Sequence, residues 1–399
     1  MFSKQQEEQI IVLCQELIQQ KSYSGNEGGA VARLHKAFEK CGYDDVFIDE
    51  YGSIIGHIKG KRPGKKILFD GHIDTVPVPD ETKWQYAPFG GELIDNKIYG
   101  RGASDMKGAL SAMVMAASYF AQSCDKNFAG DIYVVGGVHE ECFEGVAARK
   151  ISERIHPDYV VIGEASELNI KRGQRGRAEI IVETEGKSAH SANPEAGINA
   201  VYKMAKLIQK LCGLKAPEQQ ILGKGILELT DIKSEPYPGA SVVPDCCKVT
   251  YDRRLLVGET KESVLKPIID TIDELASSDK QFKAKTYLAK GTETCYTGAI
   301  ITGERFFPGW LYEEEDEFVQ KALSGLRKVG LNPEITQYSF CTNGSHYAGE
   351  KSIKTIGFGP SRENLAHTVD EYIEVEQLLK AAIGYYGILG SVFKEGQIK

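Results

Sequence analysis

The sequence has little that is typical of a membrane protein, a secreted protein or a nucleic-acid-binding protein. No apolar run among the 399 residues approaches the length of a membrane span. The formal net charge is −8, so we do not expect the basic face that nucleic-acid-binding proteins usually show. The first segment, MFSKQQEEQIIVLCQELIQQK, has the apolar spacing of an amphipathic helix and not the pattern of a signal peptide. We therefore expect a partner that is neither a membrane nor a nucleic acid.

The cysteines indicate neither a structural zinc site nor an oxidising compartment. The nine cysteines are an odd number, and no CxxC spacing occurs. The absence of CxxC argues against a thiolate-rich structural zinc site. Scattered cysteines are typical of a reduced chain, so the expected location is the cytoplasm.

The chain is long enough for two domains. Up to about residue 172, apolar strands alternate with helices, which predicts an α/β domain with a mostly parallel central sheet. Residues 173–293 show the order strand, helix, strand, strand, helix, strand, which is typical of a ferredoxin-like α+β unit. Residues 294–399 return to the first pattern. We predict that residues 1–172 and 294–399 form one domain and that residues 173–293 are inserted into it.

A polar stretch follows the apolar strand at residues 67–69. In Gly71-His72-Ile73-Asp74, the histidine and the aspartate lie two residues apart and so project to the same face of a strand. A histidine held by a carboxylate is a common arrangement in metal sites. The alternative is a strand end that happens to carry two polar residues.

Further acidic and imidazole groups occur at the ends of other predicted elements: Asp105, Glu140, Glu141, Glu164 and His367. Each has an ordinary explanation, namely a helix N-cap, a solvated turn, an ion pair or an exposed loop histidine. Ligands of open α/β sheets nevertheless collect beyond the carboxyl ends of the strands. Taken together, the groups favour a site for divalent ions, and two histidines with three carboxylates suffice for two metals that share one carboxylate.

Five motifs, in this order, resemble those of one group of cocatalytic zinc hydrolases: HIDTVP, GRGASDMKG, the paired glutamates, the GE at Glu164 and AHTVDE. This group includes aminoacylase, carboxypeptidase G, acetylornithine deacetylase and succinyl-diaminopimelate desuccinylase. The resemblance covers nearly the whole chain. The segments RGQRGR, DRRLLVGET, FCTNGS and IGFGP are most similar to a poorly characterised bacterial branch linked to selenium metabolism.

The resemblance implies a zinc-peptidase-like catalytic domain that binds two divalent metals. Zinc is the expected ion, with cobalt or manganese as alternatives. His72 and Glu164 would hold one metal, Glu141 and His367 would hold the other, and Asp105 would bridge them. The peptide bond between Asp105 and the following methionine would be cis.

The resemblance also implies roles for residues that do not bind metal. Asp74 would orient His72, and Glu140 would be the general base and acid. His190, in the segment GKSAHS, would reach the active site of a second subunit, so the inserted domain would serve as a lid and dimerisation domain in a homodimer. GKS is not a P-loop, because position 181 is isoleucine where that motif needs glycine. The alternative for His190 is a surface loop histidine.

Two positions are candidates for substrate binding. Arg254 occupies the usual place of an arginine that binds a substrate carboxylate, and a planar guanidinium suits that contact. Its alternative is an ion pair with Asp252. Asn343 lies in Thr342–His346, which replaces the usual Thr-Asp-Ala-Arg segment, and Ser241 stands where many members have asparagine. Because both departures lie where substrates are usually selected, no named substrate transfers to this chain.

The sequence therefore predicts an enzyme, a dinuclear metal-dependent amidohydrolase that cleaves an N-acyl amino acid or a small peptide-like substrate with a free carboxylate. A dipeptidase or carboxypeptidase of the same fold is the alternative within this class. A dinuclear phosphoesterase and a non-catalytic small-molecule binding protein are alternatives from other classes.

Overall fold

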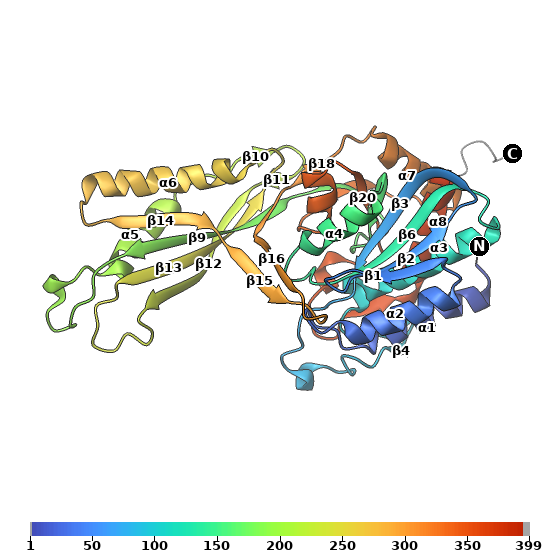
Figure 1. The fold of residues 1–399 in the computed structure, drawn as a ribbon, viewed down its shortest axis with the longest axis horizontal. Coiled ribbons are helices and arrows are strands. Elements are labelled where there is room, and N and C mark those ends of the chain that lie inside the picture. Colours follow the sequence, from blue (N-terminus) through green and yellow to red (C-terminus); the bar gives the residue numbers. More distant parts are fainter. Residues whose placement is uncertain (1, 394–399) are drawn as a thin grey trace. The chain divides into compact units, whose positions relative to one another are not determined.

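The computed structural model describes residues 2–393 and divides into two compact units (Figure 1). Unit 1 comprises Met1–Gln174, Thr292–Thr302 and Trp310–Lys399. Unit 2 comprises Arg175–Gly291 and Gly303–Gly309. Among the described residues, no helix combines the length and the apolar character that crossing a membrane requires.

Unit 1 is built on a nine-stranded sheet. Its strands are β1 (Asp45–Ile48), β2 (Ile54–Lys59), β3 (Arg62–His72), β6 (Ala129–Gly137), β7 (Tyr159–Ile162), β8 (Ile170–Gln174), β18 (Trp310–Leu311), β19 (Ile335–Tyr338) and β20 (Lys354–Gly357). The four central strands, in the order β6-β3-β7-β20, are parallel to one another. The buried parts of β3, β6 and β7 are mostly apolar runs, as expected of strands in a sheet that is covered on both faces. The predicted α/β class with a mostly parallel central sheet is confirmed.

Helices pack on both faces of this sheet. They are α1 (Lys4–Ile18), α2 (Gly28–Lys40), α3 (Gly108–Ser123), α4 (Val146–Ile155), α7 (Glu317–Lys328) and α8 (Val375–Phe393). On one face, α4 contributes Ala148 and Ile151 to a buried cluster with Leu68 of β3. On the other face, Phe69 meets Tyr385 of α8 with ring centroids 5.4 Å apart. Successive β3 residues therefore face opposite layers, which fixes the register of the strand that ends at His72.

A three-stranded sheet flanks the main one in unit 1. It comprises β4 (Glu92–Ile94), β5 (Lys97–Tyr99) and β21 (Tyr372–Glu374) in the order β21-β5-β4. Tyr372 pairs with Tyr99, so the chain leaving β5 runs beside the chain entering β21.

Unit 2 has an antiparallel sheet with the order β12-β13-β9-β14. Its elements are β9 (Gly176–Glu185), α5 (Ala200–Leu211), β12 (Ile226–Glu235), β13 (Cys246–Leu255), α6 (Lys261–Ser278) and β14 (Lys283–Leu288). The short strands β10 (Glu218–Gln219) and β11 (Gly223–Lys224) precede β12, and β17 (Phe306–Phe307) pairs with β9. Apolar residues of α5, α6 and one face of the sheet form a single core. The helix and strand order is the one that the sequence pattern indicates.

The inserted unit was predicted to end at residue 293, but the chain crosses between the two units more than once in this region. The crossing segment is a hairpin of β15 (Lys290–Thr294) and β16 (Ile300–Glu304). Thr292–Thr302 packs with unit 1, whereas Gly303–Gly309 returns to unit 2. The Tyr296 hydroxyl donates to the Gly52 carbonyl at 3.0 Å, and the Thr297 hydroxyl donates to the Glu50 carbonyl at 2.9 Å. These contacts join residues more than 240 positions apart, so local sequence could not indicate them.

Candidate metal centre

The centre begins at the carboxyl end of β3. His72 is the last residue of this strand and lies between the parallel neighbours β6 and β7. A Cβ atom at Gly71 would come within 3.1 Å of the Met106 Cε and 3.4 Å of the Leu110 Cδ1. Glycine at this position therefore allows the start of α3 to approach the strand end closely.

The His72 imidazole is buried and has partners on both nitrogens. Nδ1 lies 2.9 Å from the backbone carbonyl of Asp74 and 3.7 Å from the nearer Asp74 carboxylate oxygen. Nε2 lies 2.9 Å from an Asp105 carboxylate oxygen and 3.4 Å from one of Glu164. The hydrogen-bonding partner of Nδ1 in residue 74 is thus the backbone carbonyl, while Nε2 points at two carboxylates.

The Asp74 carboxylate holds the turn that carries the paired glutamates. Its two oxygens accept the backbone N–H groups of Glu140 and Glu141, each at 3.1 Å. The Ser24 hydroxyl donates to the same carboxylate at 2.7 Å. Because Asp74 is fully buried, these bonds fix the direction in which both glutamates leave the end of β6.

Asp105 lies just before α3, in a segment whose dihedral angles depart from helical values. The peptide bond between Asp105 and Met106 is cis, as predicted. One carboxylate oxygen faces His72, and the other lies 3.1 Å from the His367 Nε2. His367 Nε2 also lies 2.9 Å from a Glu141 oxygen. Asp105 therefore stands between the two histidines.

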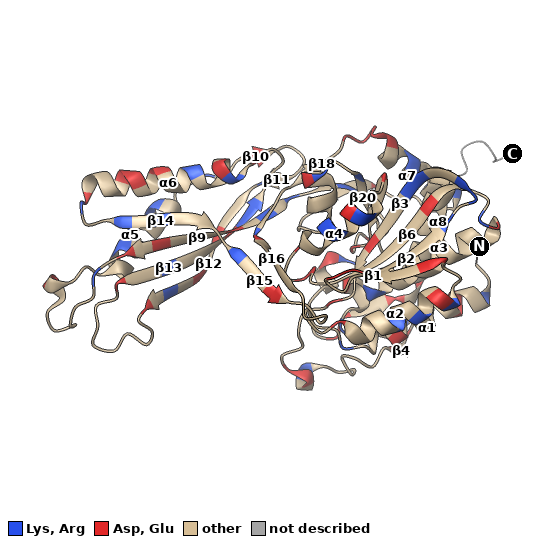
Figure 2. Ribbon diagram, in the orientation of Figure 1, with Lys and Arg blue, Asp and Glu red and all other residues tan. Residues whose placement is uncertain are grey.

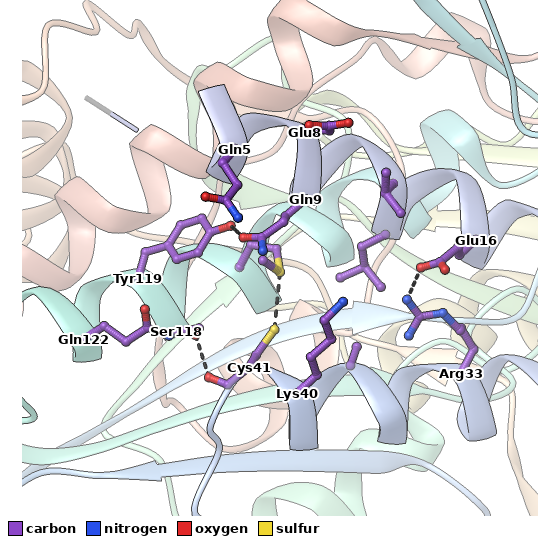
Figure 3. A pocket seen from close by; sticks show the side chains of 14 residues that line it. Gln5, Glu8, Gln9, Glu16, Arg33, Lys40, Cys41, Ser118, Tyr119 and Gln122 are labelled. Carbon is purple, nitrogen blue, oxygen red and sulfur yellow. Dashed lines mark hydrogen bonds and ion pairs between the residues drawn. The ribbon is translucent and has the colours of Figure 1, made fainter. Parts of the chain in front are cut away.

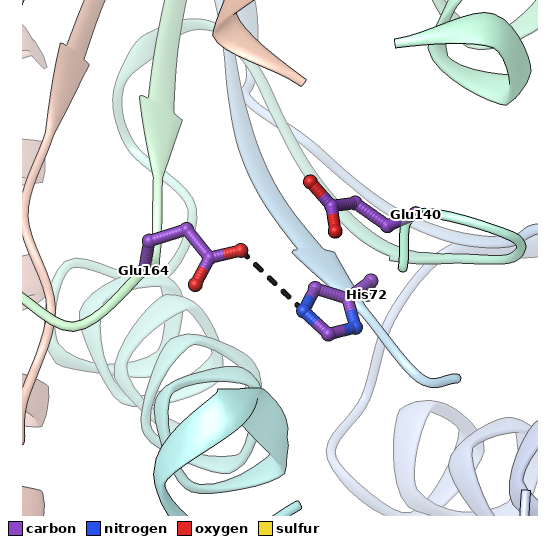
Figure 4. A group of neighbouring side chains, drawn as sticks. All are labelled: His72, Glu140 and Glu164. Carbon is purple, nitrogen blue, oxygen red and sulfur yellow. Dashed lines mark ion pairs between the residues drawn. The ribbon is translucent and has the colours of Figure 1, made fainter. Parts of the chain in front are cut away.

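Glu164 follows β7 and completes the group. Its carboxylate, that of Glu140 and the His72 imidazole lie with ligand atoms within 4.8 Å of one another (Figure 4). The same limit holds for His72, Asp105 and Glu141. These two overlapping sets of nitrogen and oxygen donors, with His367 at the edge of the second, form a candidate metal-ligand cluster that fits a divalent ion such as zinc.

The electrostatics of the cluster show an excess of carboxylate. Burial and the charges of neighbouring glutamates raise the pKa of Glu140 well above its usual value. Burial and the charge of Asp105 raise the pKa of Glu141 to about 7. Hydrogen bonds that the His367 imidazole donates to the carboxylates of Asp105 and Glu141 raise the pKa of His367 to about 10. Protein cations supply too little positive charge here, and a bound cation would relieve the repulsion.

Two of the predicted site residues, His190 and Arg254, belong to unit 2. His190 is exposed, and its Nδ1 accepts the backbone N–H of Ala192 at 3.0 Å. Arg254 lies on β13, and its Nε lies 2.9 Å from an Asp252 carboxylate oxygen. The ion pair that was the alternative for Arg254 is thus present.

Asn343 lies in unit 1, with its side-chain amide engaged by the protein. Its Nδ2 donates to buried Asp70 at 2.9 Å, and its Oδ1 accepts the backbone N–H of Gly145 at 2.7 Å. The Tyr347 hydroxyl donates to the second Asp70 oxygen at 3.0 Å. The Asn343 amide therefore connects β3, two residues before His72, to the segment after the paired glutamates. Its hydrogen bonds stabilise the contact between these two segments.

Several residues that support the cluster had no role predicted from the sequence. Ser24 lies in a polar loop with no recognisable signal. Arg101 and Glu371 stand inside quoted motifs, and they form an ion pair with side chains 5% and 0% exposed. A charged residue within a motif whose neighbours are candidate metal ligands is the signal that could have identified this pair.

A separate hollow of about 420 Å³ lies between α1, α2 and α3 (Figure 3). Glu16 and Arg33 form an ion pair at its wall, and the Tyr119 hydroxyl donates to the Gln9 side chain at 2.8 Å. Its lining includes none of the residues of the cluster.

Comparison with known proteins agrees with this geometry. The family model of peptidase family M20/M25/M40 matches residues 68–390. The uncharacterised protein YgeY of Escherichia coli (strain K12) is 34% identical over 374 residues, which cover 92% of this chain and 90% of YgeY. The succinyl-diaminopimelate desuccinylase of Cereibacter sphaeroides (strain ATCC 17025 / ATH 2.4.3) is 28% identical and covers 96% of this chain and 98% of its own length.

The fold is also that of a solved structure. The YXEP protein of Bacillus subtilis, described as a dinuclear metal-binding peptidase of the M20 family, has a TM-score of 0.71 at 13% identity. The match covers 97% of this chain and 99% of that one. The chain therefore belongs to peptidase family M20/M25/M40 and is a metal-dependent hydrolase of amide or peptide bonds.

Proposed function

We propose that the protein is a dinuclear metal-dependent amidohydrolase that cleaves an N-acyl amino acid or a small peptide-like substrate. The observation that carries this proposal is the convergence of His72, Asp105, Glu141, Glu164 and His367, with Glu140 beside them. The match to a solved peptidase described as dinuclear supports the same metal count.

The charges of the cluster favour two ions over one. Asp105, Glu140, Glu141 and Glu164 carry four negative charges when ionised, and two divalent ions would balance them. The donors are imidazole nitrogens and carboxylate oxygens, which suit zinc and also accept cobalt or manganese. His72 and Glu164 would hold one ion, Glu141 and His367 the other, and the two Asp105 oxygens, which face different histidines, would bridge them.

In the proposed site, the chemistry supplied by bound divalent ions would be a lower pKa of the attacking water and a polarised scissile carbonyl. The protein's own part in the proton transfer falls to Glu140. Its carboxylate would take a proton from the water and pass it to the leaving nitrogen. The Asp74 carboxylate accepts the Glu140 N–H and so sets the position of this base.

The proposed substrate is a small molecule with a free carboxylate, for which Arg254 is the candidate partner. In Figure 2, lysine and arginine residues are dispersed among acidic ones, which supports a small molecule over a nucleic acid. The nine cysteines are all free thiols, which supports a reducing compartment such as the cytoplasm. Cleavage of dipeptides or of C-terminal residues is the alternative within the same chemistry, and non-catalytic binding is the alternative outside it.

A substrate panel tests the proposal. Zinc-loaded protein is incubated with N-acyl amino acids, dipeptides and phosphomonoesters, and mass spectrometry detects the released products. We expect cleavage of at least one amide and no cleavage of phosphoesters. Cleavage of phosphoesters alone would contradict the proposal, and bound metal without any amide cleavage on a broad panel would favour a binding protein.

We further propose a homodimer, with unit 2 as lid and dimerisation domain and His190 acting at the metal centre of the partner subunit. His190→Ala and Glu140→Ala proteins should each be inactive, and mixing them should restore activity. In a two-fold dimer, random exchange gives about one quarter of the wild-type number of complete sites. Mixed dimers, confirmed by mass spectrometry, that show no recovery would argue against this arrangement.

A further inference from the structure

Arg101 and Glu371 form a buried ion pair that lies behind the candidate bridging carboxylate. An Arg101 guanidinium nitrogen lies 2.5 Å from a Glu371 carboxylate oxygen, although 270 residues separate the two in sequence. Both residues are placed by the small sheet, because Arg101 follows β5, Glu371 precedes β21, and these strands pair. The backbone N–H of Gly100 donates to the Glu371 carbonyl at 2.8 Å and continues that ladder.

Glu371 holds the backbone of the segment that carries Asp105. One of its carboxylate oxygens accepts the N–H groups of Ser104 and Asp105, at 2.9 and 3.1 Å. These N–H groups belong to an irregular turn, and the Glu371 carboxylate provides an acceptor for both. The other Glu371 oxygen accepts a hydrogen bond from the Arg101 guanidinium, so the carboxylate has three donors in all.

Arg101 holds the loop that carries His367. Its second terminal nitrogen donates to the His367 carbonyl at 3.3 Å. The His367 side chain is 50% exposed, and its backbone has a left-handed φ of 64°. Packing of its side chain therefore contributes little to the position of His367. The hydrogen bond from the buried Arg101 guanidinium to the His367 carbonyl contributes more.

We propose that Arg101 and Glu371 are positioning residues. Together they hold Asp105 and His367 at the distance and orientation needed to bind one metal ion between them. The inference rests on the proposed dinuclear function. Neither residue contacts the reacting atoms, so both act through the ligands. Outer partners of metal ligands typically contribute tenfold to a hundredfold to metal affinity.

The test measures zinc binding to the metal-free protein, by competition with a chromogenic chelator. Glu371→Gln keeps an oxygen that can accept the two N–H groups but loses the charge that pairs with Arg101. We expect the weaker of the two zinc-binding steps to lose about tenfold to a hundredfold in affinity. Arg101→Lys keeps the positive charge, but a lysine ammonium cannot hydrogen-bond to both Glu371 and the His367 carbonyl. This variant should weaken the same zinc-binding step to a smaller extent.

Arg253 and Glu259 supply a matched control, because they form an ion pair in unit 2 with side chains only 6% and 14% exposed. Glu259→Gln should leave both zinc-binding steps unchanged. Unchanged zinc binding in folded Glu371→Gln or Arg101→Lys protein would overturn the positioning role, even if the melting temperature falls. An equal loss in Glu259→Gln would overturn it as well. Wild-type protein that binds fewer than two zinc ions would instead refute the dinuclear proposal itself and this inference with it.

Discussion

Glu140→Ala protein is expected to lose most of its turnover while it keeps its bound metal. The proposed base contributes proton transfer to and from the reacting groups, a contribution that is typically 10²- to 10⁴-fold in rate. Glu140 is buried and held by its backbone N–H to Asp74, so truncation of the side chain leaves the turn in place. Steady-state kinetics on a cleaved amide, with metal analysis of the same sample, measures both quantities.

Metal retention decides how a loss of turnover in this variant is interpreted. Glu140 has a ligand atom within 4.8 Å of those of His72 and Glu164, so it could instead be a ligand. Loss of one ion in Glu140→Ala would assign Glu140 to the metal and leave the proton transfer to another group. Normal turnover on a substrate that the wild-type protein cleaves would refute its role as base.

Asp105→Asn should lower activity by a different route, through the loss of metal. An asparagine side chain has one oxygen and an NH₂ group, and it cannot bridge two cations as a carboxylate does. Loss of metal assistance removes several kcal/mol of transition-state stabilisation, which corresponds to a rate decrease of about 10³-fold. Metal analysis after gel filtration should show fewer than two ions per chain.

Asp131→Asn is the matched control for this variant. Asp131 also faces a histidine, with one carboxylate oxygen 2.9 Å from the His57 Nε2, and it lies in unit 1 away from the metal centre. Its metal content and turnover should match those of the wild-type protein. Two ions per chain in Asp105→Asn, with unchanged turnover, would refute the bridging role.

The sequence predicted the proximity of the candidate ligands because parallel strands share one carboxyl edge. His72 ends β3, Glu164 follows β7 and the paired glutamates follow β6, and these three strands are direct neighbours. Apolar runs and their polar ends are local signals, so the α/β class and this edge followed from spacing alone.

The supporting contacts could not be predicted in this way, because each joins distant segments. The amide of Asn343 donates to Asp70 across 273 residues, and this contact exists only when the loop that carries Asn343 lies beside β3 in the folded chain. Asp74 was expected to orient His72 through its carboxylate, yet that carboxylate spans the N–H groups of the glutamate turn. The periodicity of a strand shows which face a side chain occupies but not which backbone groups from elsewhere converge on it.

Zinc titration of metal-free wild-type protein, with amide hydrolysis measured at each addition, tests the central proposal most directly. A dinuclear amidohydrolase should bind two zinc ions per chain, and hydrolysis of an N-acyl amino acid or dipeptide should reach its maximum at the second equivalent. Full activity at one equivalent, or two bound ions without hydrolysis of any amide in the panel, would contradict it.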